Sequence, residues 1–291
     1  MTPASLCDEP MTTTAAHLSL PPVTADPGSL RAAWRIFWRG GLMSYGMLFN
    51  WARPSIYFPT LIGGPTFQLL FFAALGSYAA GRSPAYFALG NAVQVSALAG
   101  IFGMTMAIAN ERWFSTLPAI LATPANRIAL FAGRFLPFIA NGLFVSLYAI
   151  AFGVIFLGVR FEASTLGVAG LALLVTVFSC TAIGALQGAI SLRLRDGLFG
   201  ANLLMLTFLL FCGVNIPVAS LPAWMQVISN LLPFTHGLEA VRQAAAGAGL
   251  HRVGGLIATE AAIGVAYSVG AFALFSYLER SARANATLDV R

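Results

Sequence analysis

The sequence predicts an all-α integral membrane protein with six transmembrane helices. Apolar residues make up 58% of the 291 residues and charged residues only 9%, whereas soluble domains carry about 25% charged residues. The mean hydropathy is +0.80. Six apolar runs are long enough to cross hydrocarbon about 30 Å thick as helices that rise about 1.5 Å per residue. These runs are residues 55–76, 87–109, 131–158, 166–192, 198–215 and 256–278.

The chain ahead of the first apolar run divides into a tail and an amphipathic helix. Residues 1–28 are rich in Thr, Ala, Pro and Ser and lack hydrophobic periodicity, so we expect a disordered cytosolic tail. Residues 29–53 place aromatic residues and arginines on opposite sides at helical spacing, which is typical of a helix in the membrane interface. The alternative is an amphipathic helix packed on a soluble domain, but no soluble domain follows in the sequence. The residues that define the interfacial helix are Arg31, Trp34, Arg35, Phe37, Trp38 and Arg39.

The arginines set the orientation of these segments. With the N-terminus inside, twelve arginines lie on the cytosolic side, and only Arg82, Arg160, Arg242 and Arg252 lie outside. Cytosolic segments of membrane proteins carry an excess of positive charge. We therefore expect a multi-pass protein of a bacterial cell (plasma) membrane with both termini cytoplasmic. Residues 54–280 would form the transmembrane domain, and residues 281–291 a cytosolic C-terminal tail.

About forty residues between the fifth and sixth runs fit neither a loop nor a span. Ser220–Asn230 predicts a short helix with Ser220 at its N-cap. Thr235 then caps a second helix that runs to about Gly247. A helix of that length covers only about 20 Å, too little to cross. We therefore expect paired short outer helices between spans five and six.

The basic residues exclude several classes of function. All sixteen are arginine, whereas a P-loop needs a lysine on the terminal phosphates and Schiff-base chemistry needs one as well. The arginines stand singly and form no dense stripe, which argues against nucleic-acid binding. The cysteines and histidines show no metal-ligand or nucleophile spacing. We expect no catalytic residue, metal or cofactor on this chain, and no ATP hydrolysis by a P-loop of its own.

A short charged segment, residues 110–127, interrupts the second and third apolar runs. Glu111 and Arg112 end the second run, and the residues that follow supply an apolar side. Thr123–Pro124 ends the helix, because proline disfavours helical geometry in the residue before it. Two interpretations fit this pattern. The segment is a helical connection that lies on the bilayer, or a coupling helix that docks into a cleft of an ATP-driven partner.

The residues of this segment resemble a family pattern. Glu-Arg-x-x-x-Thr-Leu-x-x-x-Leu-Ala-Thr-Pro, from Glu111 to Pro124, followed by Arg127 and Gly133-Arg134, is similar to the ABC-2 type exporter permeases. These are membrane subunits of ABC exporters of drugs, lipids or surface polysaccharides. One departure is Ser115, where many members have glycine. The resemblance covers residues 30–280, and its second part is Gly213-Val214-Asn215-Ile216-Pro217, Leu221-Pro222-Ala223-Trp224, Leu232-Pro233-Phe234-Thr235 and Glu239-Ala240-Val241-Arg242.

The resemblance implies partners that the sequence itself does not contain. Two permease chains, identical or homologous, would pair with two copies of an ABC ATPase subunit that binds ATP and Mg²⁺. The permeases sit in the lipid bilayer, and closure of the motor presses on the coupling helix. The residues implied to couple to the ATPase are Glu111, Arg112, Trp113, Phe114, Thr116, Leu117, Leu121, Thr123 and Pro124.

Polar residues inside the apolar runs and on the outer helices form a second set of candidates. Most polar residues at membrane depth bond between helices, and contact with substrate is the alternative. The candidates for a substrate path or outer gate are Gln68, Asn91, Gln94, Asn202, Asn215, Trp224, Phe234 and Glu239. Near them, Glu260 is expected to pair with Arg242 or Arg252 or to sit in headgroup water. Glu239 and Arg242 have the spacing of an intrahelical pair.

The nearly uncharged runs and the 23 Phe, 7 Tyr and 5 Trp favour an amphipathic, lipid-like or drug-like substrate, which the family resemblance implies is moved outward. A proton-driven multidrug transporter is an alternative, but it needs several acids or histidines at midplane. A membrane enzyme acting on lipid-linked substrates is another, but it needs clustered acids or histidines at one membrane face. The ten acidic residues are dispersed along the chain.

Overall fold

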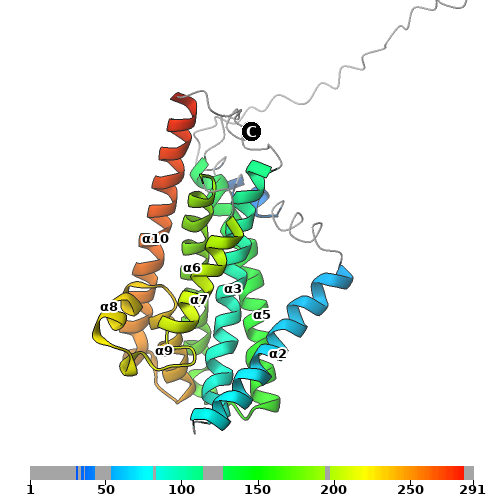
Figure 1. Cartoon of the computed structure of the whole chain (residues 1–291), viewed down its shortest axis with the longest axis vertical. Coiled ribbons are helices and arrows are strands. Elements are labelled where there is room, and N and C mark those ends of the chain that lie inside the picture. The colour runs from blue at the N-terminus through cyan, green and yellow to red at the C-terminus, as the bar shows by residue number, and fades with distance from the viewer. Residues whose placement is uncertain are drawn as a thin grey trace, which may run out of the picture.

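The computed structural model is a bundle of α-helices, with no strand in the part of the chain that it describes. Figure 1 shows the long helices side by side, with the shorter ones against one half of the bundle. The described residues are 31, 34–35, 37–42, 54–80, 83–113, 127–193 and 197–284.

Each of the six predicted apolar runs coincides with one helix, although the fifth helix ends at Phe211, four residues before the predicted end of that run. The helices are α2 (Pro54–Ala80), α3 (Pro84–Trp113), α5 (Arg127–Phe156), α6 (Leu166–Ser191), α7 (Gly197–Phe211) and α10 (Leu250–Ala284). Helices α3, α5, α6 and α10 each contain a stretch long and apolar enough to cross a membrane, whereas the apolar stretches of α2 and α7 are shorter. The 15 residues of α7 cover only about 22 Å. The prediction of an all-α, multi-pass membrane protein is therefore confirmed, and six complete crossings remain a prediction.

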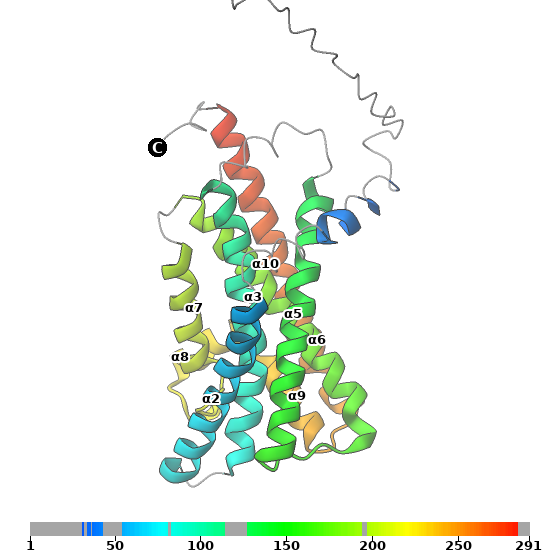
Figure 2. The ribbon, with the colours of Figure 1, turned by 90° about the vertical axis from the view of Figure 1, so that its right-hand side faces the viewer.

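Helix α3 lies at the centre of the bundle. It contacts α2, α5, α6 and α7, and Figure 2 shows it between them. Its side chains at Ala88, Val93, Ala97 and Ile101 are 0% exposed. Most of the apolar stretch of α3 is buried, and a mostly buried helix has little need of a polar face, which explains why this run is apolar without a clear stripe.

Small residues allow α3 and α6 to approach closely. A Cβ atom added to Gly184 of α6 would lie 2.8 Å from the carbonyl oxygen of Gly100 and 2.8 Å from Cα of Ile101. The hydroxyl of Thr105 donates a hydrogen bond of 3.1 Å to the Gly184 carbonyl across the same interface. Close backbone contact of this kind is a main source of helix association in membranes, where lipid is as apolar as the side chains.

The paired short helices are present between α7 and α10. They are α8 (Ala223–Leu231) and α9 (Thr235–Ala245), preceded by the 3₁₀ turn η2 (Val218–Ser220). The connection ahead of α6 contains a similar turn, η1 (Ala163–Thr165). In Figure 1, α8 and α9 lie against the half of the bundle opposite the C-terminal end of α10.

The predicted N-caps of both short helices are wrong. Ser220 lies in the 3₁₀ turn, and its hydroxyl donates to the carbonyl of Pro217, so Pro222 occupies the N-cap position of α8. Thr235 is the first residue of α9, and its hydroxyl donates to the carbonyl of Ser229. Both hydroxyls are thus engaged with the preceding chain. Phe234 precedes α9 with a positive φ of 91°.

The described part of the predicted interfacial helix packs on α5. Residues 37–42 are helical, and a Cβ added to Gly41 would lie 2.9 Å from the Gly133 carbonyl oxygen. Trp34 and Trp38 are 62% and 47% exposed, and their rings lie 6.1 Å apart. Exposed tryptophans beside arginines are typical of the headgroup region, and the interfacial position of this helix remains a prediction.

Addition of one methyl group at Gly184 tests the close α3–α6 contact. We expect Gly184→Ala to lower the thermal midpoint of the detergent-purified protein by several degrees, because overpacking costs about 1–3 kcal/mol. Gly170→Ala on the same helix is the control, since nothing lies within 4 Å of its added Cβ. Alanine there should leave the midpoint unchanged or raise it. Equal shifts for the two variants would contradict the packing.

Candidate functional site

Four side-chain amides meet between α2, α3 and the connection after α7. Gln68 Nε2 donates to Asn91 Oδ1 at 3.2 Å and to Gln94 Oε1 at 3.0 Å. Asn91 Nδ2 donates to Asn215 Oδ1 at 2.9 Å and to the Phe87 carbonyl at 2.9 Å. We call Gln68, Asn91, Gln94 and Asn215 the amide cluster. Four residues singled out from the sequence are thus brought together from segments far apart in the chain.

The amide cluster has a buried side and an accessible side. Asn91 and Gln94 are 0% and 3% exposed, whereas Gln68 and Asn215 are half-buried. Asn91 uses its oxygen and both amide hydrogens within the protein. Among the described residues, no hydrogen bond engages Gln68 Oε1 or the side-chain nitrogens of Gln94 and Asn215. The cluster therefore retains both acceptor and donor capacity for a solute.

Arg242 holds the chain segment that carries Asn215. Its Nη1 donates to the Gly213 carbonyl at 2.7 Å, and its Nη2 to the Val214 carbonyl at 2.8 Å. The guanidinium lies 4.0 Å from the ring centroid of Tyr86, a cation–π geometry. Gly90 permits this approach, because an added Cβ would lie 2.6 Å from both Arg242 Nη2 and the Val214 oxygen. Arg242 thus holds the segment against α3, through hydrogen bonds to two carbonyls of the segment and the contact with Tyr86.

Glu260 forms a second buried polar centre, ten residues after the start of α10. It is 0% exposed. Its Oε1 accepts the backbone N–H of Phe234 at 2.6 Å and the hydroxyl of Ser179, and its Oε2 accepts the N–H of Gly237 at 3.0 Å. The predicted pairing with Arg242, Arg252 or headgroup water is therefore wrong. Helix α9 folds over the carboxylate and supplies backbone donors, which have no sequence signature.

The predicted Glu239–Arg242 pair is also replaced by other contacts. Glu239 is exposed and accepts a hydrogen bond of 2.9 Å from Gln243 one turn further along α9. Arg242 reaches the carbonyls after α7 instead, because these oxygens lie at the end of a helix and need donors.

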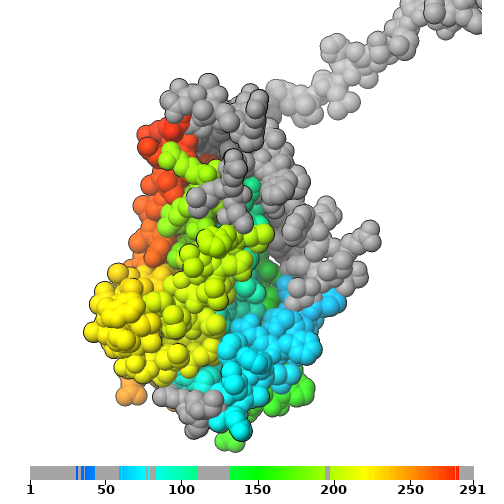
Figure 3. Space-filling model, in the orientation of Figure 1, coloured from blue at the N-terminus to red at the C-terminus, as the bar shows by residue number. Residues whose placement is uncertain are grey.

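The other predicted path residues lie apart from the amide cluster. Asn202 is exposed on α7, and its side chain bonds the carbonyl of Leu198 in its own helix. Trp224 is 62% exposed on α8, in the segment that projects from the bundle (yellow in Figure 3). Phe234 is 0% exposed and packs on Phe208, with ring centroids 5.8 Å apart. Sequence reasoning missed Gly90, Tyr86 and the carbonyl contacts of Arg242.

The predicted coupling segment is described only in part. The backbone of Glu111, Arg112 and Trp113 forms the last turn of α3. The remaining predicted residues, Phe114, Thr116, Leu117, Leu121, Thr123 and Pro124, lie outside the described residues. The end of α3 and the start of α5 lie at the same end of the bundle (Figure 2), so the segment begins and ends there, as expected.

Comparison with known proteins identifies the family. The model of the ABC-2 type transporter family matches residues 31–245, about three quarters of the chain. The chain belongs to this family. It is also 22% identical over 139 residues to the probable multidrug ABC transporter permease YbhR of Escherichia coli K12, and equally to that of the O157:H7 strain. The match covers 48% of this chain and 38% of each relative, so the chain spans well under half of their length.

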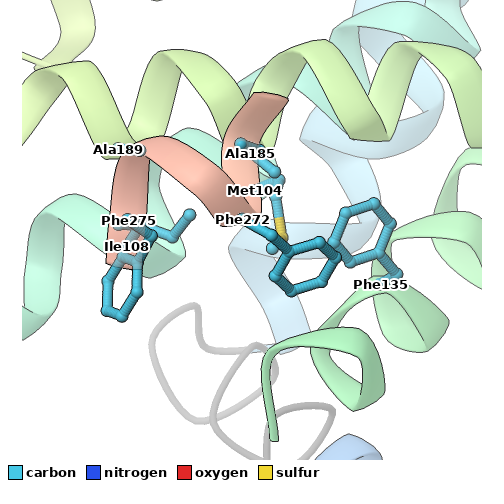
Figure 4. Close-up of a pocket in the computed structure, with 8 residues that line it drawn as sticks. Met104, Ile108, Phe135, Ala185, Ala189, Phe272 and Phe275 are labelled. Atoms are coloured by element: carbon cyan, nitrogen blue, oxygen red, sulfur yellow. The ribbon is translucent and has the colours of Figure 1, made fainter. Parts of the chain in front are cut away.

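Figure 4 shows an apolar pocket that lies apart from the amide cluster. It is lined by Met104, Ile108, Phe135, Ala185, Ala189, Ala271, Phe272 and Phe275. Its lining offers no side-chain hydrogen-bonding group. Among the described residues, no group of three or more His, Cys, Asp or Glu is placed to hold a metal ion. Polar recognition of a solute is therefore better served by the amide cluster than by this pocket.

Replacement of Asn91 tests whether the amide cluster stabilises the bundle. We expect Asn91→Leu to lower the thermal midpoint in detergent, because the amides of Gln68 and Asn215 lose a partner at a cost of about 1–3 kcal/mol. Asn202→Leu is the matched control, since Asn202 is exposed and bonds only its own helix. That variant should leave the midpoint unchanged or raise it. A silent Asn91→Leu would show that the cluster contributes nothing to stability.

Proposed function

We propose that this chain is the permease subunit of an ATP-driven exporter that moves an amphipathic, lipid-like or drug-like substrate outward. The observation that carries the proposal is the match to the ABC-2 type transporter family over residues 31–245. The similarity to a probable multidrug ABC transporter permease supports it. The amide cluster, set in an otherwise apolar bundle, supplies a place where a solute would be bound.

The proposed topology has six crossings and both termini in the cytoplasm. Helices α2 and α7 would cross with the help of flanking residues. Arg193 follows α6, and Arg280 lies in the last turns of α10. The last turns of α6 and α10 lie at the same end of the bundle as the end of α3 and the start of α5 (Figure 1). Positive charge at this end supports its assignment to the cytoplasm.

The motor of the proposed exporter is a separate chain. Two ABC ATPase subunits would bind ATP and Mg²⁺ and pair with two permeases, identical or homologous. A chain without lysine cannot build the P-loop that holds the terminal phosphates, which supports this division. The segment from Glu111 to Pro124 would dock into the ATPase and transmit its closure to α3 and α5.

The chemistry of the amide cluster favours an uncharged or weakly charged substrate. Amides donate and accept hydrogen bonds but offer no opposite charge to an ion. An ion without a partner at membrane depth would lose its hydration at a cost of several kcal/mol. The aromatic and aliphatic side chains around the cluster would take the apolar part of an amphipathic molecule.

The two alternative functions gain no support from the described residues. A proton-driven transporter needs an acid that exchanges protons with water, whereas Glu260 is 0% exposed and surrounded by three donors. A membrane enzyme on lipid-linked substrates needs acids or histidines gathered at one face, and the described ones form no such group.

Co-expression with the ABC ATPase subunits of the source genome tests the proposal. We expect this chain and one such subunit to co-purify and, in liposomes, to show vanadate-sensitive ATP hydrolysis and ATP-dependent dye transport. Glu111→Ala should leave insertion and co-purification intact but reduce transport at least severalfold, because the coupling contact is weakened.

Glu162→Ala is the matched control for the coupling variant. Glu162 is exposed in the connection between α5 and α6, and this connection lies at the other end of the bundle (Figure 2). Its loss should not affect transport. Failure to co-purify with any ATPase would overturn the exporter assignment. Full transport by Glu111→Ala, Trp113→Ala and Leu117→Ala would overturn the coupling role alone.

A further inference from the structure

Helix α9 is capped by a residue that belongs to another helix. The first turn of an α-helix leaves backbone N–H groups without partners inside the helix, and an Asp, Asn, Ser or Thr at the N-cap usually accepts them. In α9 the N-cap position holds Phe234, which makes no side-chain cap. The carboxylate of Glu260, from α10, accepts the N–H groups of Phe234 and Gly237 instead. The positive end of the helix dipole favours an acid at this place.

The cap also stabilises a backbone conformation that side chains other than glycine rarely adopt. Phe234 has a φ of 91°, which costs about 1–3 kcal/mol in a non-glycine residue. Its ring is 0% exposed and packs on Phe208 of α7. The Phe234 N–H that Glu260 accepts is part of this strained turn, so the carboxylate holds both the turn and the start of α9.

The opposite end of α9 is held as firmly. Arg242 lies in the last turn of the helix, where positive charge is favoured, and donates to the carbonyls of Gly213 and Val214. The hydroxyl of Thr165 donates to the Ala244 carbonyl at 2.6 Å, which ties the same turn to the start of α6. Between the two ends, Leu238 and Val241 are 1% exposed in the core.

These contacts form a continuous path from α10 to the amide cluster. Glu260 fixes the start of α9, Arg242 at its end fixes Val214, and the next residue is Asn215. Asn215 accepts the hydrogen bond from Asn91 that joins it to the cluster. Helix α9 has 11 residues and packs against both α6 and α10. A short helix held at both ends thus connects Glu260 to Asn215 through hydrogen bonds.

We propose that Glu260 and Arg242 are positioning residues that act through α9 to hold Asn215 in the amide cluster. The functional meaning of this coupling rests on the proposed export function, in which the cluster binds the substrate. Movement of α10 against the bundle would then change the geometry of the cluster without any direct contact between Glu260 and the solute.

A double-mutant cycle on the purified full-length chain tests this proposal. Asn215→Ala lowers the thermal midpoint in the otherwise wild-type chain, because the amide of Asn91 loses its acceptor. In the Glu260→Gln background we expect Asn215→Ala to shift the thermal midpoint by less than half as much as it does in the wild-type chain. A glutamine has one acceptor oxygen and cannot accept both the Phe234 and the Gly237 N–H through separate oxygens, so Asn215 is already loosened. Residues that are not coupled give additive shifts.

Two further backgrounds complete the cycle. Glu239→Gln is the matched control, because it changes an exposed carboxylate of α9 whose side-chain partner is Gln243. The Asn215→Ala shift should be unchanged in it. Arg242→Lys keeps the charge but loses the two-carbonyl contact, and it should reduce the shift as Glu260→Gln does. If Glu260→Gln fails to fold, the Arg242→Lys background alone tests the path through α9.

The outcomes separate this proposal from the proposed function. Additive shifts in both the Glu260 and the Arg242 backgrounds would overturn the path through α9 and leave the exporter assignment intact. A reduced shift in the Glu239→Gln background would also overturn it, since the effect would then not depend on the cap. The cycle measures the stability of the permease alone, so it holds or fails independently of any ATPase.

Discussion

Polar groups inside an apolar bundle must find their hydrogen-bond partners within the protein, because lipid offers none. This constraint determines how the half of the molecule that contains α8 and α9 is built. The carboxylate of Glu260 is satisfied by two backbone N–H groups and a hydroxyl, and the guanidinium of Arg242 reaches two carbonyls. Because both side chains bind backbone groups, they hold α9 against α10 and against the connection after α7. The paired short helices are therefore part of the bundle and not a loop laid over it.

The same constraint explains the amide cluster. Asn91 is fully buried, and its three hydrogen bonds reach its own helix, α2 and the segment after α7. A structural explanation accounts for that residue completely. Gln68 and Asn215 are different, because they are half-buried and keep side-chain groups unengaged among the described residues. The structural interpretation thus accounts for Asn91, whereas contact with substrate remains a proposal for Gln68 and Asn215.

Periodicity and composition were sufficient to predict the helices of the bundle, since apolar runs of this length have few alternatives. They also singled out Gln68, Asn91, Gln94 and Asn215, because amides are conspicuous within apolar runs. The hydrogen-bond partners of the charged side chains could not be predicted in the same way. Glu260 and Arg242 bind backbone groups, which every residue carries and no sequence pattern marks. The prediction of the two N-caps was wrong for a related reason, because the hydroxyls of Ser220 and Thr235 donate to carbonyls in the preceding chain.

In the proposed exporter, the amide cluster lies on a path that opens and closes as the ATPase cycles. Thiol accessibility at Gln68 tests this most directly. Gln68→Cys would be introduced after replacement of Cys7, Cys180 and Cys212 by alanine, in the permease–ATPase complex reconstituted in liposomes. We expect a water-soluble maleimide to modify this cysteine at a rate that changes at least severalfold when vanadate traps the ATPase. The same rate in the resting and the trapped complex would contradict it.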